Sequence, residues 1–143
     1  MKDGFISMTD NDRFSKARGV YVLWFYLPES KQITIGKLGT FSFTPGIYAY
    51  CGSAQRNLYS RLERHERVKK NLHWHIDYFR AQALFLGSVV SLNQPKDGEC
   101  RLAQELLKIP GAFYPAPRFG ASDCRCPAHF IKVPIFQIKS GEG

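Results

Sequence analysis

The chain has 143 residues, 44% of them hydrophobic and 14% aromatic, and its 20 Lys and Arg against 12 Asp and Glu give a formal net charge of +8. This composition supports one domain with a packed core, which excludes a disordered chain, a coiled coil and two full-sized domains. No apolar run approaches the roughly 18 residues that a membrane span needs, and the N-terminal segment lacks the apolar core of a signal peptide. We therefore expect a cytoplasmic protein without a membrane partner.

The N-terminal third predicts a leader followed by strands. Residues 1–18 are charged and poor in apolar side chains, so we expect a flexible leader. Residues 19–27 carry aromatic and β-branched side chains on both faces, a pattern typical of a strand buried on both sides. The alternation within residues 33–43, interrupted by glycines, predicts a small hairpin, and residues 47–52 predict a second core strand.

The rest of the chain predicts two helices with a strand between them. Asn57 can begin a helix that runs to about Lys70, because its side chain can accept hydrogen bonds from the first-turn amides. Residues 73–80 fit a short helix, and residues 84–90 predict a third strand. Residues 99–108 predict a second long helix, which ends before a proline.

These elements predict the fold class α+β: a small, largely antiparallel central sheet flanked by helices, with an inserted hairpin and a C-terminal extension rich in loops. A closing strand is expected near residues 130–138. We assign residues 19–138 to a single domain and residues 139–143 to a C-terminal tail.

The first long helix places charged side chains on its apolar face. Successive helical residues lie about 100° apart, so Leu58, Leu62 and Val68 define the stripe that faces the core. Arg61 and His65 fall inside this stripe. A guanidinium stays charged and is costly to bury alone. Arg61 therefore either pairs with a buried carboxylate or borders a pocket that receives an anion.

The second long helix shows a similar feature. Leu102, Leu106 and Ile109 form its apolar stripe, and Glu99 projects onto that stripe, whereas Glu105 lies outside it. A carboxylate in the first turn is also favoured by the helix dipole alone. The two inward-facing charges, one on each helix, could instead simply pair with each other.

Two tripeptides and the first long helix carry a family resemblance. Gly19-Val20-Tyr21 and Tyr50-Cys51-Gly52 resemble the paired tripeptides of the GIY-YIG nucleases, and residues 57–65 resemble that superfamily's helix, in which an Arg and a following His or Tyr face the sheet. Over about residues 19–135 the chain closely resembles the Uri-type endonuclease branch, also catalogued as DUF123. The further segments that support this branch are residues 33–43, 73–78, 99–100 and 120–127.

The resemblance implies a metal-dependent endonuclease that hydrolyses DNA phosphodiester bonds with a single Mg²⁺ or Mn²⁺ ion. Tyr21 would orient or deprotonate the attacking water, with Tyr50 as its partner. Arg61 would hold the scissile phosphate, and Glu99 would hold the metal. The family's metal ligand usually lies further into its helix, so Glu105 remains an alternative to Glu99.

Three histidines are candidates to assist at this proposed site. Because a tyrosine is a poor base at neutral pH, Tyr21 would need a neighbouring group such as His65, His73 or His75. His73, His75 and Asp77 are also close enough in sequence for a metal site of their own, although a fourth ligand of familiar spacing is missing. A purely structural role for the two later histidines is a further alternative.

The charge is concentrated between residues 56 and 80, which hold seven basic residues against three acidic ones. We expect five of them to face DNA: Arg56, Arg64, Arg67, Lys69 and Lys70. The alternative function is a nucleic-acid-binding module on a nuclease scaffold, without turnover. Since the short chain leaves targeting unexplained, a protein partner could supply it.

The four cysteines are Cys51, Cys100, Cys124 and Cys126. Without a secretory signal we expect all of them to be reduced. Cys124, Cys126 and His129, with Cys100 or alternatively Cys51 as the fourth ligand, could hold a structural Zn²⁺, but roughly two residues normally separate paired zinc cysteines. We therefore favour packed thiols over zinc, with a zinc-stabilised interaction domain as a third functional alternative.

Overall fold

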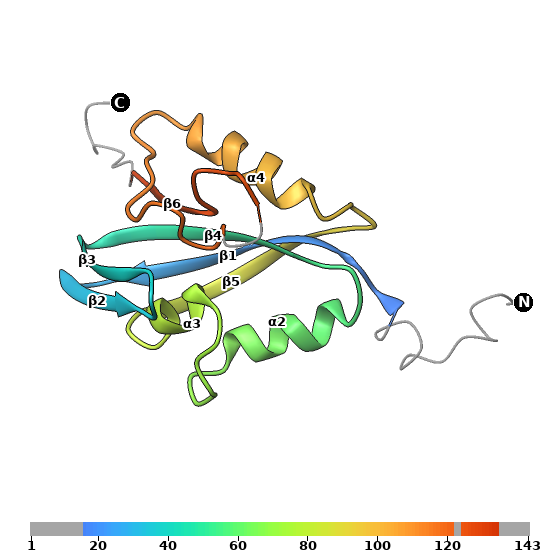
Figure 1. The fold of residues 1–143 in the computed structure, drawn as a ribbon, viewed down its shortest axis with the longest axis horizontal. Helices are drawn as coiled ribbons and strands as arrows, with labels where there is room; N and C mark the ends of the chain where they lie inside the picture. The colour runs from blue at the N-terminus through green and yellow to red at the C-terminus, as the bar shows by residue number, and fades with distance from the viewer. Residues whose placement is uncertain (1–15, 122–123, 135–143) are drawn as a thin grey trace, which may run out of the picture.

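The computed structural model describes residues 16–121 and 124–134 (Figure 1). The elements, in chain order, are β1 (Gly19–Leu27), β2 (Lys31–Ile35), β3 (Gly39–Phe43), β4 (Gly46–Ala54), α2 (Leu58–Glu66), α3 (His75–Arg80), β5 (Leu84–Leu92), α4 (Gly98–Leu107) and β6 (Phe130–Val133). The expected leader up to residue 15, the tail 139–143 and the end of the closing strand lie outside the described residues.

The main sheet has four strands in the order β5-β1-β4-β6, and every neighbouring pair is antiparallel. β2 and β3 form the expected hairpin as a separate two-stranded sheet. The α+β class with a largely antiparallel sheet is therefore confirmed. The register aligns Tyr21 with Gly52 and Leu23 with Tyr50, so these four residues share one face of the sheet.

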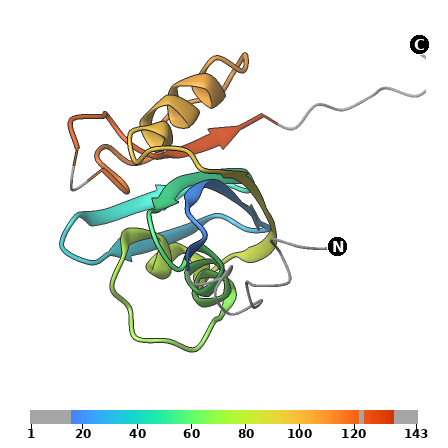
Figure 2. The ribbon, with the colours of Figure 1, turned by 90° about the vertical axis from the view of Figure 1, so that its right-hand side faces the viewer.

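Helices cover both faces of this sheet. α4 lies on one side, and α2 and α3 lie on the other (Figures 1 and 2). The C-terminal loop packs Phe119 into the core on the α2 and α3 side, against the ring of His75. Leu23 and Phe25 of β1 pack in the core on the α2 and α3 side, whereas Val22 packs with Ala103 of α4. A strand between two such layers must be apolar on both faces, which explains the composition of β1.

The hairpin completes the core on the α3 side. Phe43 contacts the rings of Tyr48, Phe79 and Phe130, with the centroids of Phe43 and Phe79 5.2 Å apart. All four side chains are essentially buried. The inserted hairpin is therefore an integral part of the hydrophobic core, and it supports the start of β4 and the helix α3.

The helix α2 is shorter than the sequence predicts, because it ends at Glu66 and not near Lys70. The ammonium of Lys70 donates hydrogen bonds to the carbonyls of Arg64 and His65, each at 3.0 Å. These bonds satisfy carbonyls that a longer helix would otherwise use. As a result Val68, expected on the buried stripe, lies outside the helix and is 54% exposed.

The start of α2 also differs from the expectation. Asn57 occupies the N-cap position, but it has left-handed dihedral angles (φ 55°, ψ 40°) and its side chain makes no capping hydrogen bond. The amide of Leu58 instead donates to the carbonyl of Ala17, at 3.2 Å. A contact with the segment before β1 thus takes the place of the side-chain cap.

In the described part of the chain, no helix is long and apolar enough to cross a membrane.

Candidate active site

A cavity of about 320 Å³ opens where β4 leads into α2 and where α4 begins. Five of the seven residues predicted to be catalytic line it: Tyr50, Arg61, His73, His75 and Glu99. Ser53, Trp74 and Lys96 line it as well. These residues come from four separate segments of the chain, which the fold brings to one place.

The other two predicted residues, Tyr21 and His65, form a buried pair beside the cavity. The Tyr21 hydroxyl and His65 Nε2 are 2.9 Å apart, and each side chain is 2% exposed. The ring of Tyr21 lies against Gly52, where an added Cβ would be 2.7 Å from the ring. Only glycine therefore fits at this position without displacing Tyr21.

Burial keeps this pair electrically neutral near pH 7. It raises the pKa of Tyr21 well above the usual value, although the Arg61 guanidinium opposes the shift. It lowers the pKa of His65 to about 3, and the nearby Lys70 cation adds to this effect. His65 Nδ1 is buried and has no hydrogen-bond partner among the described residues. The pair therefore holds one proton between a phenol and an imidazole that are both almost fully buried.

Tyr50 is held rigidly at the wall of the cavity. It is 8% exposed, and its ring contacts the rings of His65 and Phe119. Gly120, with φ +78°, lets the loop approach closely, since an added Cβ would lie 2.8 Å from the Tyr50 ring. Burial raises the pKa of Tyr50 well above its usual value, so its hydroxyl remains protonated.

Arg61 borders the cavity. Its Nη1 donates to the carbonyl of Ser53 at 2.7 Å, and its Cζ lies 4.9 Å from the centroid of the Trp74 ring. Among the described residues, no ion pair joins Arg61 to a carboxylate. Of the two expectations for this residue, the structure shows a position at the border of a pocket and, among the described residues, no pairing with a buried carboxylate.

The buried carboxylate belongs instead to Asp77, whose partner is Arg64. Asp77 is completely buried and accepts hydrogen bonds from both terminal nitrogens of Arg64, at 3.1 and 2.9 Å. It also accepts the amides of His73 and Trp74, at 2.8 and 2.9 Å. Burial alone would raise the pKa of Asp77, but these hydrogen bonds lower it. Asp77 is thus a structural anchor and does not form a metal site with the two neighbouring histidines.

This network also holds Trp74, which sequence reasoning missed. The Arg64 guanidinium lies 4.6 Å from the Trp74 ring centroid, and the Arg61 guanidinium lies over the same ring. Trp74 therefore links the Asp77 anchor to the cation in the cavity. In the sequence, only its position between His73 and His75 could have indicated that Trp74 belongs to the site.

Glu99 occupies the position that its helical face predicts. Its side chain lines the cavity and is 14% exposed. Glu105, the alternative, is 67% exposed and pairs with Lys108 at 2.8 Å on the outer face of α4. The structure therefore places Glu99, and not Glu105, next to the tyrosines.

The two histidines of the 73–78 segment differ in environment. His75 Nδ1 accepts the amide of Gly120 at 2.8 Å, and burial lowers the pKa of His75, so the proton of the neutral ring is on Nε2. His73 is exposed and packs its ring against Trp74. His75 therefore fixes the Gly120 loop, while His73 lies at the rim.

The five basic residues expected to face DNA fall into two groups. Arg56, Arg67 and Lys69 are exposed. The Lys70 side chain is only 3% exposed and lies 3.5 Å from Asp77, and Arg64 is held on the same carboxylate. Lys70 and Arg64 are therefore structural cations. Lys96 lines the cavity, but the sequence did not indicate it, because it is a single lysine in a loop outside the basic segment.

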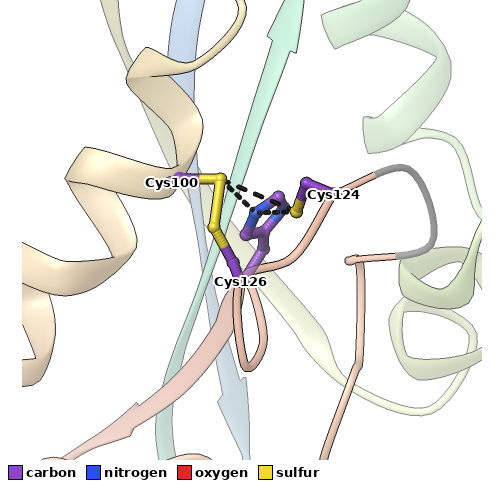
Figure 3. A group of neighbouring side chains, drawn as sticks. Cys100, Cys124 and Cys126 are labelled. Carbon is purple, nitrogen blue, oxygen red and sulfur yellow. Dashed lines mark hydrogen bonds between the residues drawn. A yellow bond between two sulfur atoms is a disulfide. The ribbon is translucent and has the colours of Figure 1, made fainter.

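The cysteines depart from the expectation of four reduced thiols. Cys100 and Cys126 form a disulfide, so that prediction is wrong for this pair, while Cys51 and Cys124 are free. The first turn of α4 and the C-terminal loop bring the sulfurs together (Figure 3). With His129, the ligand atoms of Cys100, Cys124 and Cys126 all lie within 4.8 Å of one another, so the predicted zinc ligands do form one cluster.

Comparison with known proteins gives one match. A family model described as "Domain of unknown function DUF123" matches residues 20–140. No curated protein and no solved structure matches the chain. Because the matched range covers most of the sequence and all the residues of the cavity, the chain belongs to the DUF123 family.

Proposed function

We propose that the protein is a metal-dependent endonuclease of the GIY-YIG type, which hydrolyses DNA phosphodiester bonds. One observation carries this proposal: Tyr50, Arg61 and Glu99 line a single open cavity, with the Tyr21–His65 pair directly behind it. A phosphodiester hydrolase needs a cation for the phosphate, a group that handles the proton of water and a carboxylate for a metal. The cavity and the Tyr21–His65 pair behind it together offer these side chains.

Arg61 binds the scissile phosphate in this mechanism. Its bond to the Ser53 carbonyl and its contact with Trp74 fix the plane of the guanidinium before substrate arrives. The donors not used by Ser53 can then bind phosphate oxygens, for which the planar guanidinium is well suited. Because the group is already oriented, it stabilises the negative charge of the transition state with little reorganisation.

The Tyr21–His65 pair handles the proton of the attacking water. Tyr21 is not a phenolate near neutral pH, because burial raises its pKa. It can nevertheless accept a proton from water while it passes its own proton across the 2.9 Å contact to His65 Nε2. The negative charge of the bound phosphate opposes the cost of a buried imidazolium.

Glu99 would hold the divalent ion. A single carboxylate suits Mg²⁺ or Mn²⁺, which keeps several water ligands and is completed by substrate oxygens. When bound, the ion would stabilise the negative charge that develops on the leaving oxygen. The placement of Glu99 on the first turn of α4, beside the cavity, supports this assignment.

DNA would contact the exposed cations near the cavity. Arg56, Arg67 and Lys69 are exposed, and Lys96 lies at the cavity itself. Contacts of this kind bind phosphates without reading sequence, so they predict affinity that decreases steeply with salt. A protein partner could then supply the targeting.

Nicking of supercoiled and branched DNA with Mg²⁺ or Mn²⁺ tests the proposal. Arg61→Ala and Glu99→Ala should lose activity but still bind DNA, whereas the matched control Glu105→Ala should cut like the wild type. Cleavage by both site variants at the wild-type rate would refute the assignment. Salt-dependent binding by the wild type, without product under either metal, would support the non-catalytic nucleic-acid-binding module instead.

A further inference from the structure

We propose that Cys100, Cys124, Cys126 and His129, with all three cysteines reduced, form a zinc site that fixes the first turn of α4 to the C-terminal loop. This inference concerns residues outside the cavity and does not depend on the proposed endonuclease activity. It also differs from the Glu99 site in ligand chemistry, because sulfur and imidazole ligands favour zinc over magnesium.

The distances in the cluster fit tetrahedral coordination. With zinc–sulfur and zinc–nitrogen bonds of usual length, a tetrahedral site has edges of about 3.8 Å between sulfurs and about 3.6 Å between sulfur and nitrogen. Cys100 Sγ lies 3.6 Å from Cys124 Sγ and 3.2 Å from His129 Nε2. Cys124 Sγ lies 3.3 Å from the same nitrogen. Three of the ligand atoms therefore already stand close to their coordination spacing.

The histidine is held in the orientation that a zinc ligand requires. His129 is 1% exposed, its amide donates to Phe119 and its carbonyl accepts the amide of Cys51. While Nε2 faces the sulfurs, Nδ1 lies 3.9 Å from a carboxylate oxygen of Glu99. In zinc-bound histidines the other ring nitrogen usually donates a hydrogen bond to a carboxylate or carbonyl, which fixes the tautomer. Glu99 places a carboxylate on that side of the ring, at an ion-pair distance that is longer than a hydrogen bond.

Arg118 holds the loop that carries Cys124 and Cys126 through hydrogen bonds to the loop's own carbonyls. The Arg118 guanidinium donates to the carbonyls of Ala121, Cys124 and Cys126, the middle one at 2.6 Å. These bonds present Cys124 and Cys126 to α4 without needing the disulfide. Three thiolates and a neutral imidazole around Zn²⁺ carry a net charge of −1, which the nearby guanidinium balances.

The disulfide and the zinc site are alternative states of the same side chains. A disulfide uses two of the three cysteines and gives no role to the Cys124 thiol, which lies beside the Cys100–Cys126 bond in Figure 3. It also gives no role to His129 Nε2, which lies 3.3 Å from Cys124 Sγ and 3.2 Å from Cys100 Sγ. A phosphine reductant would donate two electrons to the Cys100–Cys126 disulfide; water would supply the two thiol protons, and its oxygen would leave in the phosphine oxide. Zinc would then displace the thiol protons from the three cysteines.

Metal analysis of the full chain, purified in the presence of a phosphine reductant and zinc, tests the proposal. The wild type should retain about one zinc per chain after gel filtration, as a structural site does. Cys124→Ser should lose most of this zinc, although it leaves the disulfide pair untouched. The matched control Cys51→Ala, which changes a buried thiol outside the cluster, should retain it.

Two further measurements keep the result decisive if a variant folds poorly. His129→Cys preserves four ligands and should bind zinc, whereas His129→Ala should not. Cobalt added to the reduced wild type should give the intense visible bands of a tetrahedral thiolate site. Zinc-free reduced wild type, or unchanged zinc in Cys124→Ser, would overturn the proposal in favour of a simple disulfide with a neighbouring free thiol.

Discussion

Replacing Asp77 with Asn keeps the shape of a completely buried side chain and removes its charge. Two cations depend on that charge: Arg64, bound through both terminal nitrogens, and Lys70, whose side chain is 3% exposed. Removing one partner of a buried ion pair costs about 3–5 kcal/mol. Because the Arg64 side chain is 23% exposed, we expect a value near the lower end, about 3 kcal/mol. That is a large part of the roughly 5–15 kcal/mol that stabilises a typical domain.

Urea unfolding followed by far-ultraviolet circular dichroism measures this cost. Asp97→Asn is the matched control, because Asp97 also pairs with an arginine, at 3.7 Å, but with a side chain 72% exposed. An exposed pair should contribute less than about 1 kcal/mol. If Asp77→Asn costs no more than Asp97→Asn, the buried network does not anchor α3 and our reasoning about Trp74 and Arg61 is refuted.

The same substitution should change the response to acid. Burial alone would raise the pKa of Asp77, but the Arg64 and amide hydrogen bonds lower it below 3.8. A carboxyl with a lowered folded-state pKa stabilises the fold above its unfolded pKa, and this stabilisation is lost as pH falls through the folded pKa. Wild-type stability should therefore decrease below about pH 4, and the Asp77→Asn curve should be flatter over that interval.

Three other substitutions test separate parts of the structure. Gly52→Ala places a Cβ 2.7 Å from the Tyr21 ring and should reduce nicking more than DNA binding, as measured by nicking and filter-binding assays; unchanged nicking would contradict that contact. Tyr21→Phe leaves His65 without its hydroxyl partner and should slow single-turnover nicking by about a hundredfold or more, since general-base contributions have that size. Phe43→Ala removes a buried ring that packs on Phe79 and should lower the free energy of unfolding by about 3–5 kcal/mol in urea titrations; a loss under about 1 kcal/mol would show that the hairpin is not part of the core.

The strands could be predicted because their signal is local. β1 is apolar on both faces because layers cover both sides of it, and the alternation of the hairpin is visible in its own residues. The ends of α2 were not predictable in this way. They depend on the carbonyl of Ala17 and the ammonium of Lys70, and periodicity in the helix itself contains no information about these contacts.

The candidate site was partly predictable for a similar reason. Helical facing correctly placed Arg61 toward the cavity and His65 in the core, because both properties follow from the stripe on α2. The angular position of Arg64 on α2 could not predict that Arg64 binds the buried carboxylate of Asp77. Arg64 looks like a surface charge relative to its own helix, and only the position of α3 covers it. The angular position of a side chain on its helix therefore predicts whether it points toward the core, but not which residue of a neighbouring element it contacts.

The adjacent residues Glu99 and Cys100 connect the cavity with the cysteine cluster. Since consecutive helical side chains point about 100° apart, one can face the cavity while the other faces the C-terminal loop. A bond from Cys100 to the loop, whether through zinc or sulfur, restricts rotation of the first turn of α4, where backbone hydrogen bonds alone leave the helix free to fray. The same restriction holds the Glu99 carboxylate at the cavity. The cluster would therefore act on catalysis only through the position of Glu99, so a cysteine variant should weaken metal activation of nicking more than it weakens DNA binding.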